Sequence, residues 1–321
     1  LITSVSWQRR SSGLVTSHCC RTPTGTRAGG RVLVQALAAW LVSRPQNAVL
    51  GLAVTLLLPA PQLTSGVILV LLVLAQGTRL AVIEASAAAA ALMVVSLVFG
   101  VSLASLMTLM AGTWLPVLLL ALLLVNTRSL QLTMQVSVIL AVVAMVGFYI
   151  VVTDPVAFWQ PYLSLMAEIA RQNSLELNTE LLNAEVMTVS ATLAFWMLYI
   201  AGLLVGYGLY KKLPAKTSEF GWFRNLSFGR VIAFTMALVS LLAFVVDAAW
   251  LSNLAFVMFA VFWIQGLAIV HWMHAEGMLP LAAVISVYVL LPLLQVLLVT
   301  ALAVFGYLDA WFEFRRRFKK A

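Results

Sequence analysis

The chain has 321 residues, of which 63% are hydrophobic and 9% are charged, and its formal net charge is +8. Soluble domains carry about 25% charged residues, so this composition excludes an ordinary soluble protein and indicates an integral membrane protein. The excess of bases does not indicate nucleic-acid binding, because the basic residues lie in short clusters between apolar runs instead of on one folded aqueous face.

The first 31 residues differ from the rest of the chain. They are polar and rich in Ser, Thr, Gly and Arg, and they contain no apolar run suited to a signal peptide. The first methionine is Met93, which falls inside an expected span. We expect residues 1–31 to be a tail outside the fold, either a disordered cytoplasmic tail or translation upstream of a start near Val32 or Val34. Residues 32–321 are expected to form a single transmembrane domain.

Apolar segments recur along the chain and predict an all-α, polytopic helical membrane protein. A stretch at 33–41 is too short to cross a bilayer, which takes about 20 residues, and is expected to be an interfacial helix. The first two expected spans are short and form a hairpin broken by Pro59 and Pro61. In chain order, the expected spans are 47–60, 63–74, 80–100, 102–125, 132–152, 188–210, 231–246, 254–270 and 278–306.

Two hydrophilic segments orient these spans. Residues 153–188 carry five acidic residues and only Arg171 as a base, which predicts an extracytoplasmic loop with one or two surface helices. Residues 211–230 carry five bases and one acid, which predicts a cytoplasmic loop, because cytoplasmic loops are enriched in Lys and Arg. With a cytoplasmic N-terminus, both assignments agree through the first six spans.

The end of the chain limits the number of crossings. Nine single crossings would place the C-terminus outside, yet residues 306–320 read GYLDAWFEFRRRFKK and hold five bases. We therefore expect about eight transmembrane helices, within a range of seven to nine, and two cytoplasmic termini. Pro280 and Pro292 lie in the last apolar run and predict a broken or re-entrant element there.

The C-terminal segment 307–321 has an aromatic face and a charged face at helical spacing. This pattern predicts an amphipathic helix that continues the last span and anchors it at the cytoplasmic membrane interface. Docking of a protein partner is the alternative. The aromatic residues are Tyr307, Trp311, Phe314 and Phe318, the opposite face carries Asp309, Glu313, Arg316 and Lys320, and Arg315 and Arg317 complete the basic cluster.

The sequence shows no catalytic constellation. It lacks a phosphate-binding loop, a zinc-binding HExxH pair and a glycine-rich dinucleotide turn, so we expect neither an enzyme nor a bound cofactor. His271 and His274 are spaced to share a metal on a helix, but no third ligand is near them, and we interpret them as interfacial residues. The only cysteines are Cys19 and Cys20, and no metal or disulfide spacing includes them.

Polar residues inside apolar segments are the candidate binding residues. Gln265, next to Gly266, and Gln295 need partners within the protein. They are expected either to form hydrogen bonds between helices or to line a small-molecule pocket. Glu84 is expected either to pair with Arg79 at the interface or to form part of a ligand or proton site.

The acidic loop begins with the aromatic segment DPVAFWQPY at 154–162. Its Trp159 and Tyr162 are candidates for an extracytoplasmic lid over a binding site. An aromatic belt at the membrane interface explains the same residues.

The ending GYLDAWFEFRRR, the segment FWIQGLAIVHW and the basic loop before the seventh span resemble the YybS-like family of predicted bacterial membrane proteins, a family of unknown function. The resemblance covers residues 32–318. That family is distantly similar to the substrate-binding, or S, components of energy-coupling-factor vitamin transporters. The resemblance implies a bacterial inner-membrane protein that binds a small molecule and works with a separate coupling subunit and ATPases. The extra C-terminal spans and the large acidic loop depart from ordinary S components.

These observations favour a transporter-like membrane component that binds a small molecule. The expected partners are the lipid bilayer, a small-molecule solute, and a membrane protein partner or a separate ATPase module. Nucleic acid is not an expected partner. The alternative is a non-catalytic membrane scaffold or envelope-assembly factor that acts through protein partners.

Overall fold

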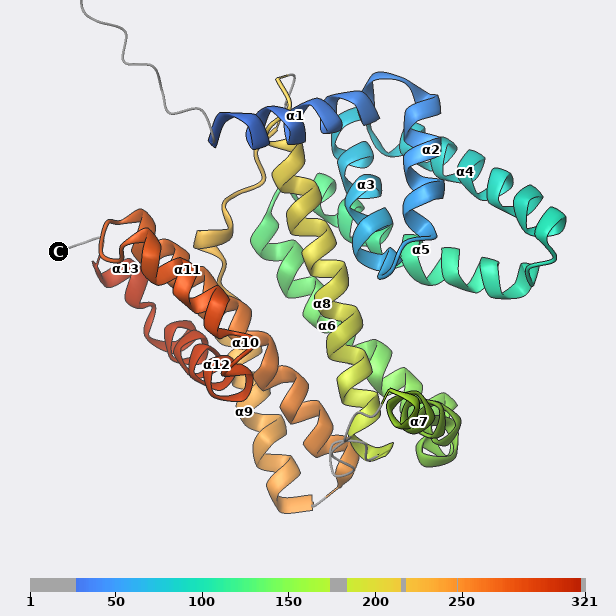
Figure 1. The fold of residues 1–321 in the computed structure, drawn as a ribbon. Helices are drawn as coiled ribbons and strands as arrows, with labels where there is room; N and C mark the ends of the chain where they lie inside the picture. The colour runs from blue at the N-terminus through green and yellow to red at the C-terminus, as the bar shows by residue number, and fades with distance from the viewer. Residues whose placement is uncertain (1–26, 174–183, 215–217, 247, 319–321) are drawn as a thin grey trace, which may run out of the picture.

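The computed structural model describes residues 27–173, 184–214, 218–246 and 248–318. These ranges are helical and contain no strand (Figure 1). Residues 1–26 of the expected tail lie outside them, whereas residues 27–31 begin the first helix. The elements are α1 (Arg27–Ser43), α2 (Pro45–Leu56), α3 (Pro61–Gln76), α4 (Thr78–Phe99), α5 (Leu103–Thr127), α6 (Leu130–Val151), α7 (Pro155–Gln172), α8 (Ala184–Tyr210), the 3-10 helix η1 (Phe223–Asn225), α9 (Gly229–Val246), α10 (Ala249–Ala275), α11 (Leu281–Leu290), α12 (Gln295–Phe312) and α13 (Phe314–Phe318).

Seven of the described helices are long and apolar enough to cross a bilayer, namely α4, α5, α6, α8, α9, α10 and α12. Their outer faces carry large apolar side chains such as Val98, Phe244 and Val296, which are 75%, 87% and 81% exposed. Such faces are stable against lipid and would be unstable in water. The chain is therefore a multi-pass helical membrane protein in contact with the bilayer, which confirms the fold class and the expected range of spans.

Helices α2 and α3 form the short hairpin that the prolines predict. With 12 and 16 residues, they rise about 18 and 24 Å, less than the roughly 30 Å hydrocarbon core. The Thr64 hydroxyl donates to the carbonyl of Thr55 at 2.8 Å and joins the two helices near their turn. Helix α3 is buried over most of its length, so it faces other helices and not lipid.

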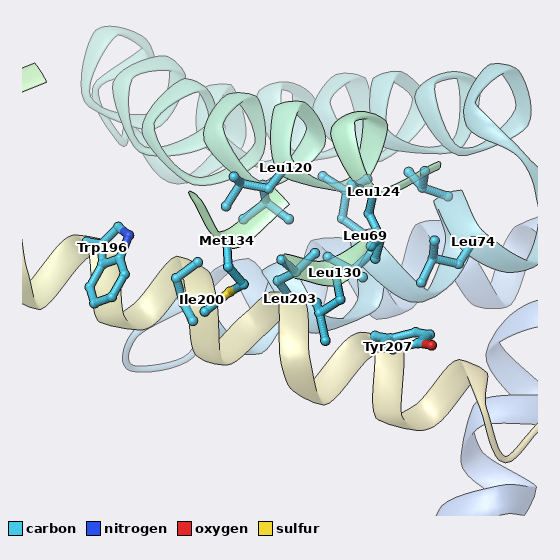
Figure 2. Packing of buried hydrophobic residues seen from close by; sticks show 14 of the residues in the cluster. Leu69, Leu74, Leu120, Leu124, Leu130, Met134, Trp196, Ile200, Leu203 and Tyr207 are labelled. Carbon is cyan, nitrogen blue, oxygen red and sulfur yellow. The ribbon is translucent and has the colours of Figure 1, made fainter. Parts of the chain in front are cut away.

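The core of the first half of the bundle surrounds α3. Leucines of α3 and α5 meet residues of α6 and α8 in one apolar cluster, as Figure 2 shows. Ser65 of α3 accepts a hydrogen bond from the indole N–H of Trp114 in α5 at 2.8 Å. The labelled members are Leu69 and Leu74 from α3, Leu120 and Leu124 from α5, Leu130 and Met134 from α6, and Trp196, Ile200, Leu203 and Tyr207 from α8.

The last apolar run is broken where Pro292 predicts a break. Helix α11 ends at Leu290 and α12 begins at Gln295, with Pro292 in the turn between them. The segment after α12 then reaches the basic loop, because Arg315 donates to the carbonyls of Arg224 and Leu226. The basic loop and the basic C-terminal segment therefore share one end of the bundle.

The N-terminal helix α1 packs against the first half of the bundle. Figure 1 shows α1 across the end of the bundle where α8 finishes, and α7 at the opposite end. The amide of Gln76, at the end of α3, donates to the Val42 carbonyl of α1 at 3.0 Å. Helix α1 therefore packs against the end of the bundle where α8 finishes, and the acidic segment supplies α7 near the start of α8.

The predicted amphipathic C-terminal helix is interrupted. Helix α12 ends at Phe312, and Glu313 adopts a left-handed conformation with φ +49° before α13 begins. The Glu313 N–H closes the end of α12 by donating to the Asp309 carbonyl at 2.9 Å. The turn sends Arg315 back toward α12, so the helical spacing read from the sequence does not extend past Glu313.

Helices α10 and α12 pack through two glycines. A Cβ built on Gly266 would lie 2.1 Å from the Leu302 carbonyl oxygen, and one built on Gly306 would lie 2.1 Å from the Phe262 carbonyl oxygen. No side chain fits in that space, because the obstructing atoms belong to the backbone of the facing helix. Small residues at such crossings let helices in a membrane approach closely.

Replacing Gly266 by alanine should separate α10 from α12. We expect Gly266→Ala to lower stability by about 1–3 kcal/mol, measured as a lower unfolding temperature of the purified protein. Gly208→Ala in α8 is the matched control, because a Cβ there meets nothing within 4 Å. An unchanged unfolding temperature for Gly266→Ala would contradict the close packing.

Candidate ligand-binding cavity

An apolar cavity of about 660 Å³ lies among α5, α6, α7 and α8. Pockets that hold small organic ligands have volumes of about 300–1,000 Å³ and mostly apolar walls. Six aromatic side chains contribute to the lining, and few polar groups do. The lining residues are Leu115, Pro116, Leu119, Leu120, Ser137, Leu140, Ala141, Ala144, Phe148, Phe158, Trp159, Thr188, Ala191, Thr192, Phe195, Trp196 and Tyr199.

Two indole groups hold the walls of the cavity together. The Trp196 N–H of α8 donates to the Ser137 hydroxyl of α6 at 3.1 Å. The Trp159 N–H of α7 donates to the Thr188 hydroxyl of α8 at 2.8 Å. Each bond joins neighbouring helices and satisfies a polar group that would otherwise be costly in an apolar wall.

A proline in α5 explains the third polar contact of the cavity. Pro116 has no N–H, so the carbonyl of Gly112, four residues earlier, has no helical partner from that position. The Tyr199 hydroxyl of α8 donates to this carbonyl at 2.5 Å. The same proline thus shapes the cavity wall and joins α5 to α8.

The two predicted lid residues occupy different positions. Trp159 lines the cavity, whereas Tyr162 is 51% exposed and does not. Tyr162 packs against Trp159 with ring centroids 5.7 Å apart, and Phe158 packs against both rings. The segment DPVAFWQPY therefore supplies one wall residue and an aromatic support behind it.

Gln265 lies outside the cavity, in a buried polar cluster between α10 and α12. Its carbonyl oxygen accepts from the Phe228 N–H at 2.7 Å, and its amide donates to the Asp309 carboxylate at 2.9 Å. Gly266 is the close-packing residue beside it. Of the two roles expected for Gln265, the structure places it in the helix-joining one.

Arg315 completes this cluster and differs from its basic neighbours. Its side chain is 12% exposed and forms an ion pair with Asp309 at 2.6 Å. Its guanidinium also donates to the carbonyls of Arg224 and Leu226 at 3.0 and 2.7 Å. The sequence pattern places Asp309 on a solvated face, but in the structure it is buried because α12 ends before the pattern does.

The other predicted anchor residues are only partly exposed or lie on the surface. Tyr307 and Trp311 pack against the core, while Phe314 and Arg317 are exposed. Arg316 is 81% exposed in its side chain and pairs with Glu313 at 2.9 Å. The side chain of Phe318, together with Lys320, falls outside the described residues.

The structure does not bring Gln295 and Glu84 together with Gln265. Gln295 is exposed at the first position of α12. Glu84 is 2% exposed, and neither of its carboxylate oxygens has a hydrogen-bond partner in the described part of the chain. Among those residues, no ion pair joins it to Arg79.

Each of the two histidines forms a hydrogen bond with a nearby residue. His271 shares a hydrogen bond of 2.8 Å with the Tyr288 hydroxyl, and His274 one of 2.9 Å with the Leu279 carbonyl. Within the described ranges, no group of three metal-ligating side chains is present.

No family model matches the chain, and no curated protein or solved structure matches it either.

The buried cluster predicts unequal roles for the adjacent arginines. Arg315→Gln should destabilise the protein by about 3 kcal/mol, because it leaves the Asp309 carboxylate buried without its counter-charge. Arg317→Gln is the matched control and should change stability by less than about 0.5 kcal/mol, as exposed substitutions do. Thermal unfolding of the two variants tests this difference, and equal effects would contradict it.

Proposed function

We propose that this protein is a small-molecule-binding component of a membrane transport system, and that its ligand occupies the cavity among α5, α6, α7 and α8. The observation that carries the proposal is the cavity itself, which combines a ligand-sized volume of about 660 Å³ with an apolar, aromatic lining. The lining includes Trp159, at the position where the sequence predicts a lid.

The chemistry of the walls favours an apolar ligand. The Ser137, Thr188 and Tyr199 hydroxyls already take part in hydrogen bonds with protein groups. Thr192 likewise donates to the Thr188 carbonyl at 2.8 Å. A ligand recognised here would therefore gain most of its binding free energy from apolar contact and shape.

The place of the cavity within the bundle fits a role in uptake or release across the bilayer. Its helices α5, α6 and α8 are candidate spans, whereas α7 comes from the acidic segment between spans. A ligand could be covered by α7 from one side only. The YybS-like resemblance supports the same role and adds a separate ATPase module as the energy source, since the chain has no phosphate-binding loop of its own.

Filling the cavity should abolish ligand binding. Ala191→Phe adds a ring inside the lining, whereas Ala194→Phe adds the same ring at an exposed position on the same helix. Native mass spectrometry of protein gently extracted from its own membrane should find an apolar molecule on the wild type and on Ala194→Phe, but not on Ala191→Phe.

The same measurement distinguishes the scaffold alternative. A wild-type protein that retains protein subunits and no small molecule would overturn the proposal and favour a scaffold. Equal retention of the molecule by both variants would show that it binds elsewhere.

A further inference from the structure

A second cavity, of about 320 Å³, lies beside the Gln265–Asp309–Arg315 cluster. It is lined by polar and charged residues from the basic loop, from α10 and from the C-terminal segment, among them Asn225, Ser227, Trp272, Asp309 and Arg316. It shares no lining residue with the apolar cavity. None of the sequence-based expectations assigns a ligand to it. It lies at the end of the bundle that holds both basic segments.

Two lining residues carry buried polar atoms that lack partners. Trp272 is 4% exposed and Asp309 is 3% exposed. The Trp272 indole N–H and the Asp309 Oδ1 atom have no hydrogen-bond partner in the described part of the chain. Leaving a donor or an acceptor unsatisfied in this way costs about 1–3 kcal/mol for each group, so an occupant that satisfies both would bind favourably.

These two atoms need opposite hydrogen-bonding partners. The indole N–H requires an acceptor, and the carboxylate oxygen requires a donor. A hydroxyl group provides both, because its oxygen accepts one hydrogen bond while its proton is donated in another. The two atoms together therefore match the hydrogen-bonding capacity of a hydroxylated compound.

Arg316 is the group in the lining that could receive an anion. Glu313 lies between Arg230, at 3.3 Å, and Arg316, at 2.9 Å, and Arg315 neutralises Asp309. The cavity lining itself holds the guanidinium groups of Arg315 and Arg316, and Arg230 reaches Glu313 from outside the lining. The Arg316 side chain is 81% exposed and can reorient toward a phosphate group, for which guanidinium groups provide matching donors.

We propose that this cavity binds a hydroxylated phosphate ester of the phosphoglycerol type, with a hydroxyl between Trp272 and Asp309 and the phosphate at Arg316. The same chemistry occurs in the headgroup of phosphatidylglycerol and in free sn-glycerol 3-phosphate. The charged end of a helical bundle is where such headgroups meet membrane proteins. The site is independent of the apolar cavity and of the function proposed for it.

Binding to the full chain can be measured for both sources of the ligand. After delipidation, native mass spectrometry would titrate dioleoyl phosphatidylglycerol against dioleoyl phosphatidylcholine, and calorimetry would titrate sn-glycerol 3-phosphate. Trp272→Phe removes the unpaired N–H and keeps an aromatic ring. Trp250→Phe is the control, because Trp250 is 46% exposed near the other end of α10.

We expect Trp272→Phe to weaken binding about tenfold, the loss that corresponds to one buried hydrogen bond, and Trp250→Phe to leave it unchanged. Lipid-free Trp272→Phe loses no hydrogen bond to protein, so any fall in its unfolding temperature comes only from the smaller buried ring. Arg316→Gln should also weaken binding, and more strongly at low salt.

The two sources give different results. Binding of phosphatidylglycerol alone assigns the cavity to a lipid headgroup, and binding of sn-glycerol 3-phosphate with the same dependence on Trp272 assigns it to the soluble ester. The proposal is overturned if phosphatidylglycerol and phosphatidylcholine bind equally, or if Trp272→Phe has no effect on either ligand.

Discussion

The hydrogen bonds and ion pair among Gln265, Asp309 and Arg315 hold together the second half of the structure. They connect α10, α12, the C-terminal segment and, through Phe228 and two loop carbonyls, the basic loop. Polar groups among membrane helices find no partners in lipid, so this arrangement satisfies groups that would be costly if separated. Because Gly266 adjoins Gln265, the same site requires α10 and α12 to be in close contact.

The two cavities differ because their walls satisfy polar groups differently. In the apolar cavity, Trp159, Trp196 and Tyr199 direct their polar atoms at neighbouring helices, which leaves apolar surface for a ligand. In the polar cavity, Trp272 and Asp309 retain unsatisfied atoms. The walls of the first cavity therefore offer shape and apolar contact, and the walls of the second offer hydrogen-bonding groups.

Several elements could be predicted from local pattern, and others could not. Apolar length predicts the spans, and the prolines at 59, 61 and 292 predict the breaks. The face assignment fails at the C-terminus because it assumes one uninterrupted helix, whereas the left-handed Glu313 ends α12, and Arg315 pairs with the buried Asp309. The sequence also could not separate the two roles open to Gln265, since both place an amide inside an apolar segment.

The sequence by itself determined that the protein is helical and membrane-embedded, with its basic segments at one end, because these properties follow from composition and from the order of apolar and charged runs. The tertiary structure decided which polar residues meet and where space remains for a ligand. Trp159 joins Thr188 across 29 positions, and Gln265 joins Asp309 across 44. Pairs so far apart in the sequence meet only when the helices pack against one another. Helix packing depends on shape complementarity, which the spacing of residues within one segment does not reveal.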